Sequence, residues 1–203
     1  MSDASQARVR MAPEARKDLL RQTAREVFAD RGYAASGLAE IAERAGVNKR
    51  LVYYYYPQGR PELFTAVMAE LTAELRADVH AAVSAPVNTA RKVERLVEAL
   101  VGYFESHPEA FTLLFKDPFG VREPEVVQEA VVAQAELARE IAKLFSSSGI
   151  PTMTLVGVTS GTLAYMLKVI ELEVAGELDH ETTVDACLTC VLGVLSQVGG
   201  ARG

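Results

Sequence analysis

The chain has 203 residues, of which 49% are hydrophobic and 24% charged, and its formal net charge is −6. This length suffices for one compact domain or two small ones, and the composition excludes wholesale disorder. Two cysteines exclude a disulfide scaffold and fit a reducing compartment. The first ten residues lack an apolar signal core, and the most apolar stretch, Leu155 to Ile170, is shorter than the roughly 20 residues that span a membrane. We therefore expect a cytoplasmic protein without a membrane partner.

The charge is divided unevenly along the chain. Residues 1–60 contain 11 Lys and Arg against 7 Asp and Glu, a net of +4, whereas residues 61–203 contain 10 against 20, a net of −10. A basic first part beside an acidic remainder favours a polyanion partner for the first 60 residues, although an excess of this size also occurs on an ordinary solvated face.

Apolar residues recur at helical spacing in nearly every long segment, and no segment alternates as a strand would. The pattern predicts an all-α fold of about nine helices. A Pro in the first turn and a left-handed Gly at the end are typical of the first helix. The helices expected in the first 60 residues run from Pro13 to about Gly32, over residues 38–45 after a cap at Ser36 or Gly37, and from a cap at Asn48 to Tyr56.

Six further helices are expected in residues 61–203. The first of them covers about residues 61–83 and links a first domain, residues 1–60, to a second helical domain, residues 61–203. Pro57, Gly59 and Pro61 break the chain before this helix. The second of them follows Pro86 and is expected to end at His107. The other four are expected over residues 109–116, 123–146, 151–175 and 181–198.

A helix-turn-helix is predicted over residues 36–56, where two short helices flank a turn at Gly46. In such a motif the N-terminal residues of the second helix meet base edges in the major groove, and here they are Asn48, Lys49 and Arg50. Because Asn can bond adenine and Lys or Arg can bond guanine, this end of the helix has the chemistry of base recognition.

Four consecutive tyrosines, from Tyr53 to Tyr56, follow the basic residues. They cannot all face one core, so one or two must be exposed, and an exposed aromatic beside basic residues favours a ligand. Val52 and Tyr56, four residues apart, are expected on the inner face of the helix. On the pattern alone, an αα-hairpin that packs its tyrosines and binds no DNA remains the alternative.

Residues 16–68 resemble the DNA-binding head of the TetR/AcrR transcription regulators, and the run from Ile41 to Val47 followed by the tyrosines is the specific part. The resemblance implies a regulator, not an enzyme, that needs no cofactor. It implies a repressor that binds a palindromic operator in double-stranded DNA as a homodimer and leaves it when a small, largely apolar effector binds. The matching residues are Leu19-Leu20, Ala24, Val27-Phe28-Ala29, Gly32-Tyr33, Ser36, Ile41 to Val47, Lys49, Tyr53 to Tyr56 and Glu62-Leu63-Phe64.

The resemblance also implies which side chains touch DNA, and the chain departs from the family pattern at several positions, among them Arg50, Leu51 and Tyr56. Asn48 stands where the family usually has Ser or Thr, and it is either a contact or only the helix cap. The link from Pro57 to Pro61 has one residue more than the usual form, so either Arg60 replaces the usual phosphate-contacting Lys or Gly59 displaces it. The implied contacts are Ser36 (to phosphate), Lys49, Arg50, Tyr53, Tyr54, Tyr55 and Arg60.

Small residues follow one face of each of the last two long helices, and small residues let helices approach closely. The resemblance implies that these helices form a four-helix interface in a homodimer. Packing of the two helices against each other within one chain is the alternative, and both can hold. The residues are Gly157, Gly161 and Ala164 on the first helix and Ala186, Cys190 and Gly193 on the second.

The middle helices are expected to enclose the effector pocket, although for each single residue plain core packing is the favoured explanation. For Lys168 an ion pair with Glu171 is favoured over a ligand carboxylate, and a helix-end role suits His107. The resemblance implies that the effector shifts the helix over residues 62–83 and so separates the DNA-reading heads. The candidates are Tyr103, Phe104, His107, Phe111, Phe115, Met153, Tyr165, Met166 and Lys168.

Other chemistry has little support in the sequence. Cys187 and Cys190 are three residues apart on a helix, but a zinc site would need two more ligands and only His180 is near, so we expect packing thiols and no metal site. No phosphate loop, paired His ligands or nucleophile elbow indicates an enzyme. The rival hypothesis is a helical ligand-binding protein that does not bind DNA, and outward-facing Lys49 and Arg50 would favour the regulator.

Overall fold

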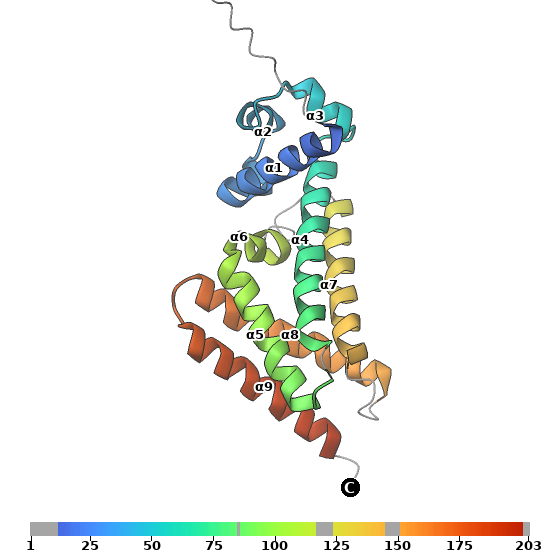
Figure 1. Ribbon diagram of the computed structural model, residues 1–203, viewed down its shortest axis with the longest axis vertical. Helices are drawn as coiled ribbons and strands as arrows, with labels where there is room; N and C mark the ends of the chain where they lie inside the picture. Colours follow the sequence, from blue (N-terminus) through green and yellow to red (C-terminus); the bar gives the residue numbers. More distant parts are fainter. Residues whose placement is uncertain (1–11, 85, 117–123, 145–150, 201–203) are drawn as a thin grey trace, which may run out of the picture. The chain divides into compact units, whose positions relative to one another are not determined.

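The computed structural model describes residues 12–84, 86–116, 124–144 and 151–200. In these ranges the chain forms nine α-helices and one π-helical turn, without a strand, so the all-α prediction is confirmed (Figure 1). The helices group into two compact units, Met1–Val67 and Met68–Gly203. The elements are α1 (Pro13–Ala35), α2 (Leu38–Arg44), α3 (Lys49–Tyr55), α4 (Arg60–Val83), α5 (Thr89–Ser106), α6 (Pro108–Phe111), the π turn η1 (Thr112–Lys116), α7 (Pro124–Leu144), α8 (Thr152–Val174) and α9 (His180–Gly200).

The core of the first unit is built on the apolar stripe of α1. Leu20 and Phe28 are fully buried, as the helical spacing predicts. The ring of Phe28 meets the ring of Phe64 edge-on, with centroids 5.0 Å apart, and Tyr33 lies 4.7 Å from Phe64. Each buried aromatic of this kind contributes about 1.5–3 kcal/mol, so the three rings hold α1 to the first turns of α4.

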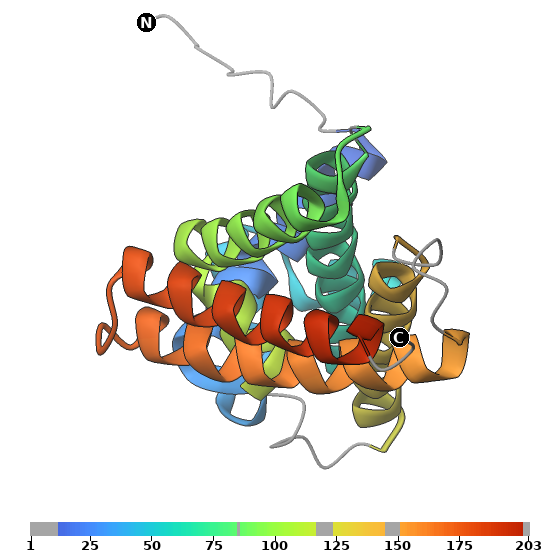
Figure 2. The same ribbon diagram turned by 90° about the horizontal axis from the view of Figure 1, so that it is seen from below.

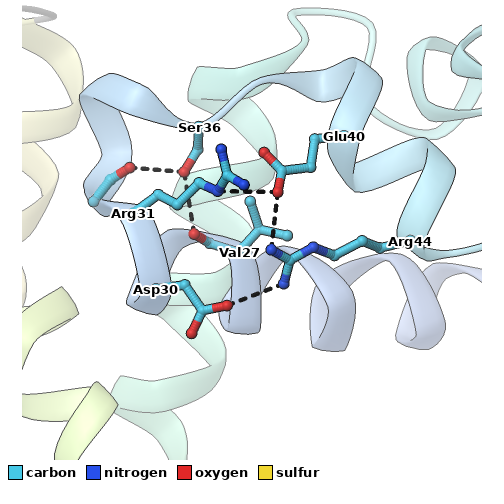
Figure 3. A network of polar contacts seen from close by, with 7 residues as sticks. Val27, Asp30, Arg31, Ser36, Glu40 and Arg44 are labelled. Atoms are coloured by element: carbon cyan, nitrogen blue, oxygen red, sulfur yellow. Dashed lines mark hydrogen bonds and ion pairs between the residues drawn. The ribbon is translucent and has the colours of Figure 1, made fainter.

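The end of α1 differs from the prediction in a way that matters for Ser36. Gly32 has φ of 72°, a region that other residues avoid, but the helix continues for one more turn to Ala35. The residue that caps α2 is Gly37, with no side-chain bond. The Ser36 hydroxyl instead points into the unit, 2.7 Å from the carbonyl oxygen of Gly32 and 3.2 Å from that of Val27 (Figure 3).

Ion pairs join α1 to α2 on the outside of this corner (Figure 3). Arg44 donates to Asp30 at 3.0 Å and to Glu40 at 2.9 Å, and Arg31 Nε lies 3.1 Å from Glu40. The hydrogen bond that Arg44 donates to Asp30 raises the pKa of Arg44 above its ordinary value, and Glu40 acts in the same direction. The positive charges of α1 and α2 at this corner are therefore neutralised within the unit.

The second unit is a helical bundle in which α8 and α9 lie side by side (Figure 2). Helix α5 packs on both of them, and α7 packs on α8. The predicted stripe of α5, from Val93 to Phe104, is buried. The single helix expected over residues 109–116 is split into α6 and the π turn η1. Leu113 and Leu114, which are adjacent in the π turn, are both buried in the core.

Helix α8 is 23 residues long, so the length argument against a membrane span is wrong. Within the described ranges it is the one helix long and apolar enough to cross a membrane, and 28% of its most apolar window is buried inside the chain. It packs on α5, α7 and α9 as part of the bundle. A single helix of this kind is ordinary in helical proteins, and part of its apolar surface is left uncovered within the chain.

Candidate nucleic-acid interface

The turn between α2 and α3 has the geometry predicted for a helix-turn-helix. Gly46, at φ 65°, donates from its N–H to the carbonyl of Glu43 at 3.0 Å, and Val47 donates to Ala42 at 2.9 Å. This pair of bonds is the Schellman ending of a helix, in which the residue at the Gly46 position must be left-handed. The reversal of the chain at Gly46 is confirmed.

Asn48 caps α3. Its side-chain oxygen accepts a hydrogen bond from the N–H of Leu51 at 2.9 Å, which satisfies one of the free donors at the helix start. Of the two roles expected for Asn48, the capping role is therefore confirmed. The cap places Lys49 and Arg50 in the first turn of α3, where the side chains of a recognition helix meet bases.

Lys49 and Arg50 are exposed, and neither forms an ion pair with any residue that the structure describes. They differ in this from Arg31 and Arg44, which share the carboxylate of Glu40. The Lys49 ammonium lies 5.8 Å from the centre of the Tyr53 ring, a distance that still allows cation–π attraction. The two cations of α3 are thus solvated and available to an anionic partner.

The tyrosines divide as the sequence predicts. Tyr54 is 75% exposed and Tyr53 is also exposed, whereas Tyr56 is buried, together with Val52. Tyr55 is half-buried, with its ring edge-on to Tyr54 at 5.1 Å. The exposed phenols lie on the same short helix as Lys49, so aromatic and cationic groups share one solvent face.

The longer link between α3 and α4 depends on Gly59. This residue has φ of 77° and donates from its N–H to the carbonyl of Tyr56 at 2.8 Å. A Cβ at position 59 would lie 3.2 Å from atoms of both Tyr53 and Leu38. A side chain is therefore disfavoured twice, by the backbone conformation and by the close approach of Tyr53.

The structure does not support the predicted contact between Ser36 and phosphate. The Ser36 side chain is 2% exposed, and the carbonyl oxygens of Val27 and Gly32 lie within reach of its hydroxyl. The kink at Gly32 brings these carbonyl oxygens within reach of Ser36, and no sequence pattern predicts that they converge there. The side chain of Ser36 ties the end of α1 to the start of α2.

Arg60 also differs from the expectation of a phosphate contact. One guanidinium nitrogen, Nη1, lies 3.3, 3.3 and 3.1 Å from the carbonyl oxygens of Tyr33, Ala34 and Ser36. The guanidinium also stacks over the Tyr33 ring, 4.3 Å from its centre. Carbonyls at a helix end carry partial negative charge, and Arg60 satisfies them from the first residue of α4.

The predicted pocket residues do not surround one cavity. Phe104, Phe111 and Phe115 pack against one another, with ring centres 5.5–5.7 Å apart, and so fill the space they were expected to enclose. The ring of His107 stacks on Tyr103, and its Nδ1 lies 3.1 Å from the Tyr103 carbonyl, in keeping with the helix-end role.

Three further members of that set face solvent. Lys168 is exposed, and its ammonium pairs with the carboxylate of Glu171 at 2.8 Å. This is the ion pair that the sequence favours over a ligand contact. Tyr165 and Met153 are exposed on α8. Among the cavities that the described residues enclose, Phe115 lines one of about 250 Å³ beside α7 and α8, and Met166 lines one of about 40 Å³ between α5, α8 and α9.

The small residues of α8 and α9 face away from their own bundle. Gly157, Gly161 and Ala164 are exposed, and a Cβ added at either glycine would meet nothing within 4 Å. The same holds for Gly193 on α9, and Ala186 and Cys190 are partly exposed. The three glycines therefore do not mediate the packing of α8 on α9 within the chain.

Comparison with known proteins agrees with this geometry. Residues 20–67 match the family of bacterial regulatory proteins described as the tetR family. The HTH-type transcriptional activator FasR of Mycolicibacterium smegmatis is 28% identical over 124 residues, which cover 61% of this chain and a little over half, 56%, of that relative.

Solved structures share the fold across both units. A TetR-like transcriptional regulator from Rhodococcus sp. RHA1 is similar with a TM-score of 0.76 and 19% identity, over 92% of this chain and 99% of that one. A tetR-family regulator from Streptomyces coelicolor is similar with a TM-score of 0.71 and 18% identity, over 95% of this chain and 85% of that one. Residues 20–67 thus match the tetR family over the helix-turn-helix that carries the exposed cations, and the chain as a whole shares the fold of TetR-family transcription regulators.

Proposed function

We propose that the chain is a cytoplasmic transcriptional repressor that binds a palindromic operator as a homodimer and is released by a small, largely apolar effector. The observation that carries the DNA-binding surface is the state of Lys49 and Arg50. They are solvated cations without a carboxylate partner among the described residues, in the first turn of the second helix of a helix-turn-helix. Helix α3 has seven residues and is about 10 Å long, which offers few base contacts. A second head is needed for useful specificity.

The proposed DNA contacts come from α3 alone. Arg50 is assigned to base edges, whereas Lys49 and Tyr53 are assigned to phosphate, and the amide group of the capping Asn48 is available beside them. Neither Ser36 nor Arg60 is retained as a side-chain contact, because both are engaged within the first unit. The proposed contacts are Asn48, Lys49, Arg50, Tyr53, Tyr54 and Tyr55.

The experiment is a titration of the purified chain with the DNA upstream of its own gene, at two salt concentrations. Arg50→Ala should relax base preference, and Lys49→Ala should weaken all sites alike and lower the salt slope by about 1. Failure of the unaltered chain to bind duplex DNA at low salt would overturn the proposal. Because the curated relative is named as an activator, a reporter gene decides the direction. Transcription that falls on removal of the regulator would overturn repression and leave DNA binding intact.

The proposed homodimer covers the outward face of α8 and α9. This face combines the small residues Gly157 and Gly161 with the exposed apolar side chains Met153 and Tyr165. Only 28% of the most apolar window of α8 is buried within one chain, and a second copy would cover the rest. Gly161→Arg should shift the chain to a monomer in light-scattering measurements after gel filtration. Gly102→Arg is the matched control, because Gly102 is also a helical glycine with open space around it but lies on α5, outside the proposed interface. This variant should remain a dimer.

The proposed effector site is the cavity of about 250 Å³ beside α7 and α8. It exceeds the roughly 150 Å³ that suffices for a benzene-sized molecule, and its wall combines apolar side chains with Gln134 and Ser160. Phe115 and Gln134 also line a small space of about 20 Å³ against Met68, Thr72 and Leu75 of α4. A ligand beside Phe115 and Gln134 would thus press on α4.

The coupling from this cavity to the DNA-binding surface is proposed to run along α4, whose first turns supply Phe64 to the aromatic core of the first unit. Ala135→Phe, which narrows the cavity, should weaken release by apolar effectors and leave operator affinity unchanged. Ala77→Phe, in the separate cavity between α4 and α7, is the control. A ligand that binds tightly without any change in operator affinity would refute the coupling for that ligand.

A further inference from the structure

Three metal-ligating side chains converge in the second unit, outside the surfaces proposed for DNA and effector. Glu105 lies in the last turn of α5, Glu173 in the last turn of α8, and His180 is the first residue of α9. Their ligand atoms all lie within 4.8 Å of one another. The structure assigns Glu105, Glu173 and His180 to a binding site for a divalent transition-metal ion such as Zn²⁺.

The backbone between α8 and α9 fixes two of the three ligands. Gly176, at φ 76°, donates from its N–H to Glu173, and Glu177 donates to Leu172, so α8 ends in a tight Schellman turn. Asp179 then caps α9 by accepting from the N–H of Thr182 at 2.7 Å, and this bond lowers the pKa of Asp179 below its ordinary value. Glu173 and His180 are therefore held on the two sides of one rigid connection.

The distances fit a coordination shell better than a simple ion pair. His180 Nδ1 lies 3.1 Å from Glu105 Oε2 and 3.3 Å from Glu173 Oε1. Ligands about 2.0–2.1 Å from a tetrahedral zinc ion are separated by about 3.4 Å, close to both values. A single N–H at Nδ1 cannot point at two carboxylates at once, whereas a cation between the three groups satisfies all of them.

The burial of Glu173 supports the same assignment. The Glu173 side chain is 8% exposed, and its second oxygen, Oε2, is buried with no hydrogen-bond partner among the described residues. A buried carboxylate oxygen without a partner is costly, and a bound cation removes that cost. The Thr183 hydroxyl, one turn after His180, is likewise buried without a described partner. Glu105 and His180 are partly exposed, so an ion can enter from solvent.

The donor set indicates the class of metal. One imidazole and two carboxylates suit Zn²⁺, Fe²⁺ or Mn²⁺, and the absence of a thiolate from the set argues against Cu⁺. Three protein ligands leave a coordination position for water. In the sequence His180 is only a neighbour of the two cysteines, and no metal site is expected from it. Only the folded bundle brings Glu105 and Glu173 to His180.

The test is calorimetric titration of EDTA-treated full-length protein with Zn²⁺ and with Mn²⁺, with Co²⁺ absorption as a spectroscopic readout. We expect one ion per chain and a rise in melting temperature on Zn²⁺ addition. Glu173→Gln and His180→Gln should each weaken binding by at least about tenfold and abolish that rise. Circular dichroism without metal checks that each variant folds.

Two matched controls separate this site from other zinc ligands. His80→Gln removes a histidine elsewhere in the unit, and Cys190→Ser removes a partly exposed thiol. Both should bind Zn²⁺ as the unaltered chain does. The assignment is overturned if Zn²⁺ does not bind, if Cys190→Ser abolishes binding, or if the Glu173 and His180 variants change only the metal-free stability, as a plain ion pair requires.

Discussion

Replacing Arg60 by Ala should destabilise the first unit without changing how its DNA affinity depends on salt. In the structure Arg60 donates to three backbone carbonyls near the end of α1 and stacks on Tyr33. If Arg60 instead met phosphate, as the family resemblance implies, the same substitution would spare stability and remove one ionic contact. The two roles therefore predict opposite pairs of results.

The expected loss follows from the geometry. A hydrogen bond from a charged donor contributes about 1.5–3 kcal/mol, and an exposed cation–π contact about 0.5–1 kcal/mol. Because one nitrogen of Arg60 shares three acceptors at 3.1–3.3 Å, these bonds count as little more than one. We expect a loss of about 2 kcal/mol in the free energy of unfolding. Arg60→Lys should lose about half of this free energy, because an ammonium group does not stack on the Tyr33 ring and does not present the planar, fixed set of donors of a guanidinium.

Urea denaturation followed by tyrosine fluorescence measures this loss. The chain has no Trp and seven Tyr, of which five, Tyr33 and Tyr53 to Tyr56, belong to the first unit. Lys49→Ala, which removes a proposed phosphate contact on the solvent face of α3, is the matched control, with unchanged stability and a salt slope lowered by about 1. An Arg60→Ala variant with the unfolding midpoint of the unaltered chain and a lowered salt slope would refute the intramolecular role of Arg60.

Further predictions concern single side chains. Asn48→Ala should cost about 1 kcal/mol in the same assay, and Asn48→Asp should cost little, because aspartate also caps helices. Gly59→Ala should cost more than about 1 kcal/mol through its φ and its 3.2 Å approach to the Tyr53 ring. Tyr54→Ala should leave the unfolding midpoint unchanged and weaken DNA binding about fivefold in a titration. Burial raises the pKa of Cys187 to about 11, so a disulfide reagent should modify it slowly at pH 8 and faster as the pH rises toward 11, measured in a variant whose other cysteine is serine. Rapid modification of folded protein at pH 8 would contradict the burial of this thiol.

The sequence predicts the local features of the first unit because short-range rules decide them. Asn48 and Gly46 act within one helical turn of their own positions, and the helical period of Leu20 and Phe28 is enough to place them in the core. The exposure of Tyr54 and the burial of Tyr56 follow from adjacent positions on one helix.

Features that join distant segments could not be predicted in the same way. The acceptors of Arg60 lie more than twenty residues earlier in the chain, and they converge only because α1 kinks at Gly32. The cavities depend on how aromatic rings such as Phe104 and Phe111 interdigitate, which composition and period do not determine. The carboxylates near His180 come from two other helices, so no local sequence motif predicts that they meet His180.

Glu40 has a consequence for the orientation in which the first unit meets a duplex. Its carboxylate binds both Arg31 and Arg44, and Arg44 also holds Asp30, so the corner of α1 and α2 shows little net charge. Without Glu40 the Arg31 guanidinium would lose this carboxylate and Arg44 would keep only Asp30, so that corner would compete for phosphates with Lys49 and Arg50. If DNA binds the proposed surface, an acidic residue outside that surface thus favours the side of the domain that a polyanion approaches, because Glu40 keeps the corner of α1 and α2 nearly neutral.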